Sequence, residues 1–283
     1  LNNLNLDVKQ GEIFGLLGPN GAGKSTFINI LGGIVIKSKG NVNVWGYDLD
    51  KDPRQVRASL GIVPQEVNLD PFFNPRKLLE LHAGMYGVKK KDQITEEILK
   101  LVALENNADS YARSLSGGMK RRLLIAKALV HKPPILILDE PTAGVDVELR
   151  KNLWENVKEL NKIGVTIILT THYLFEAQEM CNRIAIINKG NLVALDTTEK
   201  LLERIKTKTI NFKVKNFDLK KNLAMRGVKF RVNNKNSISV TYEKDSLNFE
   251  EIINYFNNND IKIVDISTED GDLEDVFVQL TKH

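Results

Sequence analysis

The chain contains a single cysteine, Cys181, among its 283 residues, and it lacks any long apolar run. One thiol excludes an internal disulfide and a cysteine-based metal cluster, and it is typical of a protein in a reducing compartment. A membrane-spanning helix needs about 20 predominantly apolar residues. The strongest apolar stretches, Ile135–Leu138 and Val165–Leu169, have the length of buried strands. If the protein acts at a membrane, we therefore expect another subunit to cross it.

The N-terminal segment Leu1–Leu17 lacks the basic start and apolar core of a secretory signal. Because the first residue is not methionine, we expect a truncated or processed N-terminus. The formal charge of +4 is spread along the chain, which is too diffuse for a nucleic-acid footprint, so no nucleic-acid partner is expected. The short basic runs Lys89–Lys91 and Lys120–Arg122 are predicted to be solvated faces.

Strand-like and helix-like segments alternate through about residue 200, a pattern that predicts an α/β domain with a largely parallel sheet. The expected strands are Glu12–Leu17, Val42–Trp45, Leu60–Val63, Ile135–Asp139, Thr166–Thr170 and Ile184–Asn188. The expected helices are Lys24–Leu31, Ser116–His131 and Val147–Ile163, the last with Asp146 as N-cap. A helical pattern also runs from Pro75 to Ala103 and places Leu78, Leu79, Leu81, His82 and Met85 on one face.

The composition shifts after about Glu203 toward asparagine and lysine, and we expect a small α+β domain over residues 205–283. Its expected strands are Thr209–Val214, Val228–Val232, Ser237–Tyr242 and Ile261–Ile266, and its expected helices are Leu219–Met225, Phe249–Asn257 and Leu273–Thr281. The order β-α-β-β-α-β is that of a ferredoxin-like module.

A glycine-rich loop lies between the first expected strand and helix. Residues 18–25 read Gly-Pro-Asn-Gly-Ala-Gly-Lys-Ser and match the phosphate loop G-x-x-x-x-G-K-[ST]. The alternative, a glycine turn that happens to precede a helix, arises by chance in about one chain of this length in a hundred. The sequence therefore predicts a nucleotide site with backbone N–H groups and a helix N-terminus aimed at the phosphates. The residues expected to bind are Gly18, Pro19, Asn20, Gly21, Ala22, Gly23, Lys24, Ser25 and Thr26.

Two carboxylates follow the buried strand Ile135–Asp139. Asp139 at its end is placed to ligate Mg²⁺ beside the phosphates, together with the Ser25 hydroxyl. Glu140 follows directly and can orient or deprotonate an attacking water. Taken alone, an apolar strand that ends in Asp-Glu before Pro141 is more often only a strand end. With the phosphate loop, it predicts the second half of a nucleotide-hydrolysing site.

Leu115-Ser-Gly-Gly-Met119 resembles the signature motif of the ATP-binding cassette (ABC) ATPases. In physical terms this is a second anion site, in which Ser116 caps a helix and Gly117 and Gly118 expose backbone N–H groups. In isolation, an ordinary capped helix would explain it as well. Because the motifs occur in the family order, we read the chain as similar to an ABC ATPase over about residues 1–205.

The resemblance implies roles for further residues at matching positions. Gln65 resembles the glutamine that senses Mg²⁺ and the attacking water and faces the membrane subunit, and it joins Ser25 and Asp139 as an expected metal contact. The segment Pro141–Asp146 resembles the loop that communicates between the two ATPase subunits, and Asp146 is its last residue. His172 resembles the histidine that contacts the γ-phosphate. With Glu140 as base, the expected catalytic residues are Glu140, His172 and Gln65, whereas His82, His131 and His283 match no motif.

The resemblance also implies an architecture and partners. The expected fold is an α/β P-loop cassette over residues 1–204, with a mixed sheet and a helical subdomain at about 66–131. In this family two cassettes pair head to tail with ATP and Mg²⁺ between one phosphate loop and the partner's signature. Since this chain holds one cassette, a second copy comes from another chain.

The segment Thr268–Thr281 is similar to the closing segment of ATPase subunits in two-component drug, antibiotic, lipid or polysaccharide exporters. This implies a separate permease and a cytoplasmic, peripheral location on the inner face of the membrane. The chain departs from the family pattern at Met119, where glutamine is commoner, and in lacking an adenine-stacking aromatic in Leu1–Gln10. Two alternatives stay open, a soluble ABC ATPase acting on nucleic acid or ribosomes and a nucleotide sensor that does not hydrolyse.

Overall fold

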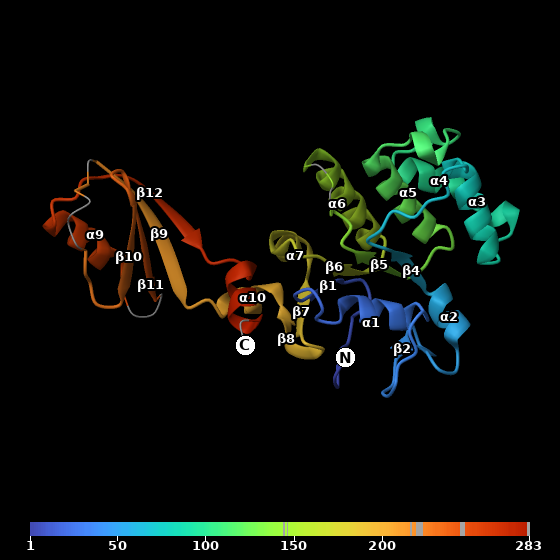
Figure 1. The fold of residues 1–283 in the computed structure, drawn as a ribbon, viewed down its shortest axis with the longest axis horizontal. Helices are drawn as coiled ribbons and strands as arrows, with labels where there is room; N and C mark the ends of the chain where they lie inside the picture. Colours follow the sequence, from blue (N-terminus) through green and yellow to red (C-terminus); the bar gives the residue numbers. More distant parts are fainter. Residues whose placement is uncertain (144, 146, 216, 219–222, 244–246, 282–283) are drawn as a thin grey trace. The chain divides into compact units, whose positions relative to one another are not determined.

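The computed structural model describes residues 1–143, 145, 147–215, 217–218, 223–243 and 247–281 (Figure 1). The chain divides into two compact units, Leu1–Thr197 and Thr198–His283, each of which is described by itself. The boundary falls before helix α8 (Thr198–Glu203), whereas the sequence pattern places it after residue 204. No helix among the described residues is long and apolar enough to span a bilayer.

A six-stranded sheet in the order β4-β5-β6-β1-β7-β8 forms the centre of the first unit. Its neighbours from β4 to β7 pair in parallel, and β8 runs antiparallel to β7, so the predicted mixed sheet is confirmed. Strands β1 and β6 are buried along their whole length, because helices cover both faces of a parallel sheet. The strands are β1 (Ile13–Leu17), β4 (Leu60–Val63), β5 (Ile135–Asp139), β6 (Thr166–Thr170), β7 (Arg183–Asn188) and β8 (Asn191–Thr197).

Strand β8 and the short ribbon of β2 and β3 differ from the sequence prediction. A tight turn with Lys189 and Gly190 at positive φ reverses the chain between β7 and β8. Both backbone conformations are those of a two-residue hairpin turn. The expected strand Val42–Trp45 shortens to β2 (Asn43–Val44), which pairs with β3 (Tyr47–Asp48).

Helices lie on both sides of the central sheet, with α1 and α2 opposite α5 and α6 in Figure 1. A further group of α3, α4 and α5 packs together beside the sheet. The helices of this unit are α1 (Lys24–Leu31), α2 (Pro53–Ala58), α3 (Pro75–Met85), α4 (Thr95–Leu101), α5 (Gly117–Leu129), α6 (Val147–Lys162) and α7 (Leu174–Met180).

The helical pattern predicted from Pro75 to Ala103 is broken in the structure. Helix α3 ends at Met85, before Gly87 at φ +77°, and α4 begins only at Thr95. The prediction of a single apolar face was wrong in part: Leu78 and Leu79 are buried, but Leu81 is 47% and Met85 72% exposed. The apolar face that periodicity predicts for α3 thus includes side chains that stay exposed in this unit.

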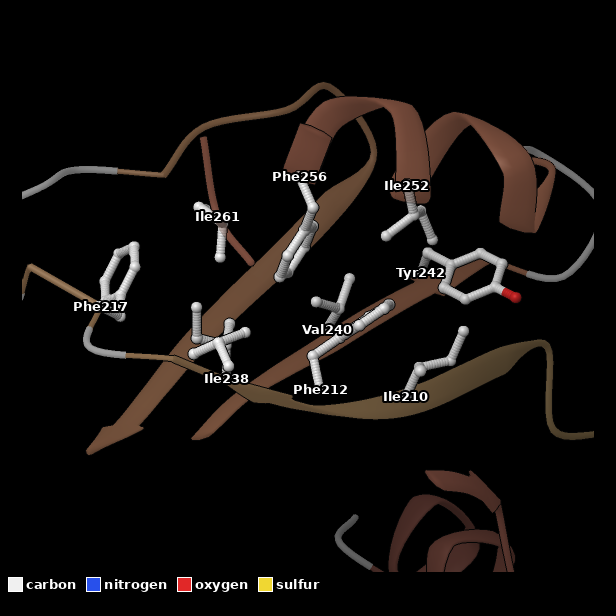
Figure 2. Packing of buried hydrophobic residues seen from close by; sticks show 10 residues of the cluster. Ile210, Phe212, Phe217, Ile238, Val240, Tyr242, Ile252, Phe256 and Ile261 are labelled. Carbon is white, nitrogen blue, oxygen red and sulfur yellow. The ribbon is translucent and has the colours of Figure 1, made fainter. Parts of the chain in front are cut away.

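The second unit contains a four-stranded antiparallel sheet in the order β10-β11-β9-β12. Helix α9 (Phe249–Asn258) covers one face, and its Ile252 and Phe256 point onto Phe212 and Ile210 of the sheet (Figure 2). The rings of Phe212 and Phe256 stack at a centroid distance of 4.4 Å. The strands and the last helix are β9 (Thr207–Val214), β10 (Val228–Asn234), β11 (Ser237–Glu243), β12 (Ile263–Asp270) and α10 (Leu273–Thr281).

The helix expected at Leu219–Met225 is only partly covered by the structure. Residues 219–222 lie outside the described residues. Leu223 and Ala224 are not helical, and Met225 forms an isolated antiparallel bridge with Val228 across Gly227 at φ +78°. The described end of this expected helix is therefore a turn that leads into β10.

Candidate functional site

The predicted catalytic segments meet at one edge of the central sheet. The phosphate loop follows β1, Gln65 follows β4, Asp139 ends β5, and His172 follows β6. Strands β1, β6 and β5 are neighbours in the sheet, and all run parallel. Because the carboxyl ends of parallel strands share one edge, segments far apart in sequence converge there.

The phosphate loop has the backbone conformation that its glycines permit. Gly21 and Gly23 have φ values of +78° and +111°, in the region that disfavours other residues. At Gly18 a Cβ atom would lie 2.3 Å from the carbonyl oxygen of Ile187 in β7, so the loop needs glycine to pass this strand. Helix α1 begins directly after Gly23, and its N-terminal N–H groups face the loop.

The Lys24 side chain lies folded across the phosphate loop and is largely buried. Its Nζ donates hydrogen bonds to the carbonyl oxygens of Gly18 (2.7 Å) and Pro19 (3.3 Å). Burial lowers the pKa of the Lys24 ammonium, and the charges of Glu140 and Asp139 act in the opposite direction. The ammonium is therefore held on the loop, within reach of the charges of both carboxylates.

Two predicted catalytic side chains converge on the carboxylate of Glu140. The Gln65 amide Nε2 donates to Glu140 Oε2 at 2.9 Å, and His172 Nδ1 lies 3.2 Å from the same oxygen. Three segments from the ends of β4, β5 and β6 thus meet at one carboxylate, as expected if they act on one reacting group.

The backbone of Glu140 is held in the left-handed region at φ +46°, which is uncommon for a residue with a Cβ atom. Its N–H donates to the carbonyl oxygen (3.0 Å) and to the hydroxyl Oγ1 (3.2 Å) of Thr170 at the end of β6. The Thr170 hydroxyl in turn donates a short hydrogen bond to Asp139 Oδ1. Thr170 therefore contacts both residues of the Asp139–Glu140 pair.

A cavity of about 620 Å³ brings most of these residues together. It is lined by the phosphate loop and by the polar ends of β4, β5 and β6: Asn20, Gly21, Ala22, Gly23, Lys24, Ser25, Thr26, Gln65, Asp139, Glu140 and His172. Gly18 and Pro19 do not line the cavity, but their carbonyl oxygens accept the hydrogen bonds of Lys24, which does. This is the size and polarity of a site for a small, charged ligand.

The signature residues do not line this cavity. Ser116 caps α5 as predicted, since its hydroxyl accepts a hydrogen bond from the Met119 N–H at 3.2 Å. Ser116 and Gly117 are exposed at the helix start, and Gly118 is half-buried. Asp146, the remaining predicted contact, lies outside the described residues.

Several residues around the site were missed by sequence reasoning. The basic run Lys120–Arg122 was predicted to be solvated, but Arg121 is buried, and that prediction was wrong for it. Glu176 of α7 is also buried and accepts hydrogen bonds from the hydroxyls of Thr142 (2.8 Å) and Thr171 (3.3 Å). Its only sequence signal is a carboxylate four residues after His172, too common a pattern to single out.

Comparison with known proteins places the chain in a family. A profile of the ABC transporter family matches residues 1–143. The linearmycin resistance ATP-binding protein LnrL of Bacillus subtilis is 42% identical over 209 residues, which are 73% of this chain and 67% of that protein. The Nod factor export ATP-binding protein I of Cupriavidus metallidurans is 41% identical over 206 residues, 72% of this chain and 68% of that protein.

Solved structures agree with this assignment. The ATP-binding subunit of an ABC transporter matches with a TM-score of 0.64 at 30% identity, over 70% of this chain and 84% of that chain. A dimeric ATP-binding cassette in a post-hydrolysis state, bound to ADP and Pi, matches with a TM-score of 0.62 at 30% identity, over 70% of this chain and 90% of that chain. The chain therefore belongs to the ABC transporter family and is an ATP-binding subunit that hydrolyses ATP for transport.

Proposed function

We propose that this subunit powers an exporter, and that it does so by closing head to tail on a second copy of itself around ATP. The observation that carries the chemistry is the convergence of Gln65 and His172 on Glu140, in the cavity that also contains Lys24. The names of two relatives, a resistance protein and an export protein, support the outward direction.

In the proposed binding mode, the phosphates of ATP lie on the loop from Gly18 to Thr26. Backbone N–H groups and the N-terminus of α1 stabilise the negative charge. The Lys24 ammonium exchanges its carbonyl partners at Gly18 and Pro19 for the outer phosphate oxygens. The neighbouring carboxylates favour the charged form of this lysine, which the phosphates need.

In the proposed chemistry, Glu140 takes a proton from the attacking water. Both Gln65 and His172 contact its Oε2 atom, so Oε1 is the oxygen that we assign to the water. Gln65 and His172 hold this carboxylate through these contacts, and His172 is also proposed to contact the terminal phosphate. A base held by two neighbours needs little reorganisation when the water arrives.

The donor atoms fit Mg²⁺, which we propose to be held by the Ser25 hydroxyl and the Asp139 carboxylate, with Gln65 beside them. No group of three or more histidine, cysteine or acidic side chains suited to a metal occurs within the described ranges. Mg²⁺ takes few protein carboxylates and completes its shell with phosphates and water, so one hydroxyl and one carboxylate suit it. Mg²⁺ bound here would offset the negative charge of the phosphates, and the hydrogen bond from the Thr170 hydroxyl would hold the Asp139 carboxylate in place for it.

The second copy is proposed to supply Ser116, Gly117 and Gly118 to the ATP, and the likeness to a dimeric cassette supports this pairing. We expect the E140Q variant, which binds ATP without cleaving it, to elute at twice the monomer mass when ATP is added. The matched variant S116R/E140Q should still bind ATP in its own cavity but remain monomeric. An E140Q protein that stays monomeric with saturating ATP would contradict the head-to-tail pairing.

The permease is proposed to dock in a groove of about 360 Å³ between β4 and the helical group. Arg57, Pro64, Tyr86 and Lys127 line it, and Pro64 directly precedes Gln65. The described residues that line it include no acidic side chain, while Met85 nearby is largely exposed. The groove therefore suits a cytoplasmic segment of the permease with apolar residues and a carboxylate, which would place this subunit on the inner face of the membrane.

This docking can be tested by co-purification from detergent-solubilised membranes. The parent chain should retain a polytopic membrane protein in stoichiometric amount, and the charge reversal R57E/K127E should lose it without loss of ATP turnover. Retention by the reversed variant would contradict the groove, and capture of ribosomal or DNA-repair proteins in place of a permease would contradict the transport role.

We also propose a domain organisation. The cassette spans residues 1–204 with a helical subdomain at about 66–131, supported by the mutual packing of α3, α4 and α5. Residues 205–283 form a separate domain with ferredoxin-like topology. Its support is the antiparallel strand order β10-β11-β9-β12 and the placement of α9 between β11 and β12.

A further inference from the structure

Arg121 is a buried cation at the centre of the catalytic edge. It lies in the first turns of α5, five residues after the capping Ser116, and is only 3% exposed. A guanidinium is rarely buried without partners, because the loss of hydration must be offset by hydrogen bonds. Its partners therefore show what holds it there.

All three guanidinium nitrogens of Arg121 donate to backbone carbonyl oxygens, and these belong to two catalytic segments, residues 64–65 and 139–141. Nε donates to Pro141 at 2.8 Å, Nη1 to Pro64 and Gln65 at 2.8 Å each, and Nη2 to Glu140 and, at 3.4 Å, to Asp139. The planar fork of arginine presents these donors in a fixed geometry. One side chain thus joins the segment of Gln65 to the segment of Glu140.

The contact matters most at Glu140, whose backbone is in the left-handed region. Such a conformation costs free energy and persists only where surrounding contacts hold it. The N–H of Glu140 is held from β6 by Thr170, and its carbonyl is held from α5 by Arg121. The peptide of the proposed base is therefore fixed from both sides.

The charge of Arg121 also suits this place. Burial lowers the pKa of the guanidinium, while the nearby Asp139 and Glu140 carboxylates act in the opposite direction. Within the described residues, the hydrogen bonds of the Arg121 guanidinium go to backbone carbonyl oxygens, and both carboxylate residues, Asp139 and Glu140, line the cavity. It supplies positive charge near them while its hydrogen bonds leave their carboxylate oxygens to other partners.

We propose that Arg121 is a positioning residue for ATP hydrolysis, which sets the distance between Gln65 and Glu140 and ties both to the helix that begins at the signature. It touches neither ATP nor water. Because Ser116 and Arg121 lie on the same helix start, a shift of the signature is transmitted to both catalytic segments of the same chain. The inference rests on the proposed roles of Gln65 and Glu140.

The neighbouring Arg122 provides a matched control. It is also on α5, is half-buried, and donates through Nη1 to the carbonyl oxygens of Val102 (2.9 Å) and Ala103 (2.8 Å). These carbonyls lie at the end of α4, outside the catalytic cavity. If a guanidinium on this helix served stability alone, both arginines would respond alike to the same substitution.

The test uses the full chain with the variants R121M, R121K and R122M, and measures kcat, KM, the Kd of a fluorescent ATP analogue and the thermal unfolding midpoint. We expect R121M to lower kcat at least 30-fold while the Kd changes less than threefold. R122M should keep kcat within threefold. R121K keeps the charge but offers one nitrogen in place of three, so we expect kcat to remain at least tenfold low. If R121M does not fold, R121K alone tests the proposal.

Three results would overturn this role: R121M or R121K with kcat within threefold of the parent, a rise in Kd that matches the fall in kcat, or an equal loss of kcat in R122M. ATP turnover by the parent and by E140Q distinguishes a failure of this inference from a failure of the proposed function. If the parent turns over ATP and the Glu140 variant does not, but R121M is fully active, only the role of Arg121 fails. If E140Q is as active as the parent, the proposed function fails first.

Discussion

Substitution of Thr170 by valine removes one hydroxyl at the junction of the two catalytic carboxylates. The side chain is fully buried at the end of β6, and valine has nearly the same shape, so no cavity forms. What is lost is the hydrogen bond to Asp139 Oδ1 and one of the two acceptors for the Glu140 N–H. We predict that T170V folds but hydrolyses ATP slowly.

The magnitude follows from the kind of hydrogen bond. A bond to an ionised carboxylate contributes about 1.5–3 kcal/mol, and each 1.4 kcal/mol of transition-state stabilisation is about tenfold in rate. If the bond acts mainly by orienting Asp139 toward the metal, kcat should fall roughly tenfold to hundredfold. The free energy of unfolding should fall by about 1–3 kcal/mol, since the Asp139 oxygen loses its donor.

The matched control is T166V at the opposite end of the same strand. Thr166 is also buried, and its hydroxyl accepts a hydrogen bond from the Gly11 N–H at 2.9 Å, far from the cavity. Steady-state ATPase assays and urea unfolding should give both variants a loss of stability, but only T170V a loss of kcat. Parental turnover in T170V, or an equal loss in T166V, would refute this reasoning.

Two further predictions concern the packing away from the site. F212A removes a fully buried ring stacked on Phe256 and should destabilise the second unit by about 3–5 kcal/mol. Hydrogen exchange in F212A should then be faster in β9 and β11 than in the parent, with unchanged protection in β1. Protection of β9 equal to that in the parent would contradict this prediction. Burial, with the charges of Lys127 and His131, lowers the pKa of His82 to about 4, below its unfolded value of 6.5. Stability should therefore be lost as the pH falls from 6.5 toward 4, and H82Q should flatten this dependence in urea unfolding at pH 7 and pH 4.5.

The chemistry of the site could be predicted from sequence because its residues stand in short, ordered motifs. The phosphate loop, the pair Asp139–Glu140 and the buried strands before them each constrain the backbone locally, through glycine conformations and apolar runs. Parallel strands then bring the ends of β1, β4, β5 and β6 to one edge, so Gln65 and His172 arrive beside Glu140 without any local signal.

The supporting contacts could not be predicted, because they depend on the tertiary structure. Arg121 reads as a surface residue between Lys120 and Arg122, and only the packing of α5 against the catalytic edge buries it. Strand β8 became recognisable through its pairing with β7. Similarly, the exposure of Leu81 and Met85 depends on which elements pack against α3, and the periodicity of the α3 sequence does not contain that information.

The most direct test of the account is the rate of ATP hydrolysis by the E140Q variant beside its affinity for ATP. Glutamine keeps the size of the side chain and can still contact Gln65 and His172, but it cannot accept the proton of water. The account predicts that E140Q binds ATP within a few-fold of the parent and loses at least 99% of its Mg²⁺-dependent turnover, on the order of 3 kcal/mol in activation free energy. Turnover near the parental rate would contradict the assignment of Glu140 as the base and the mechanism built around it.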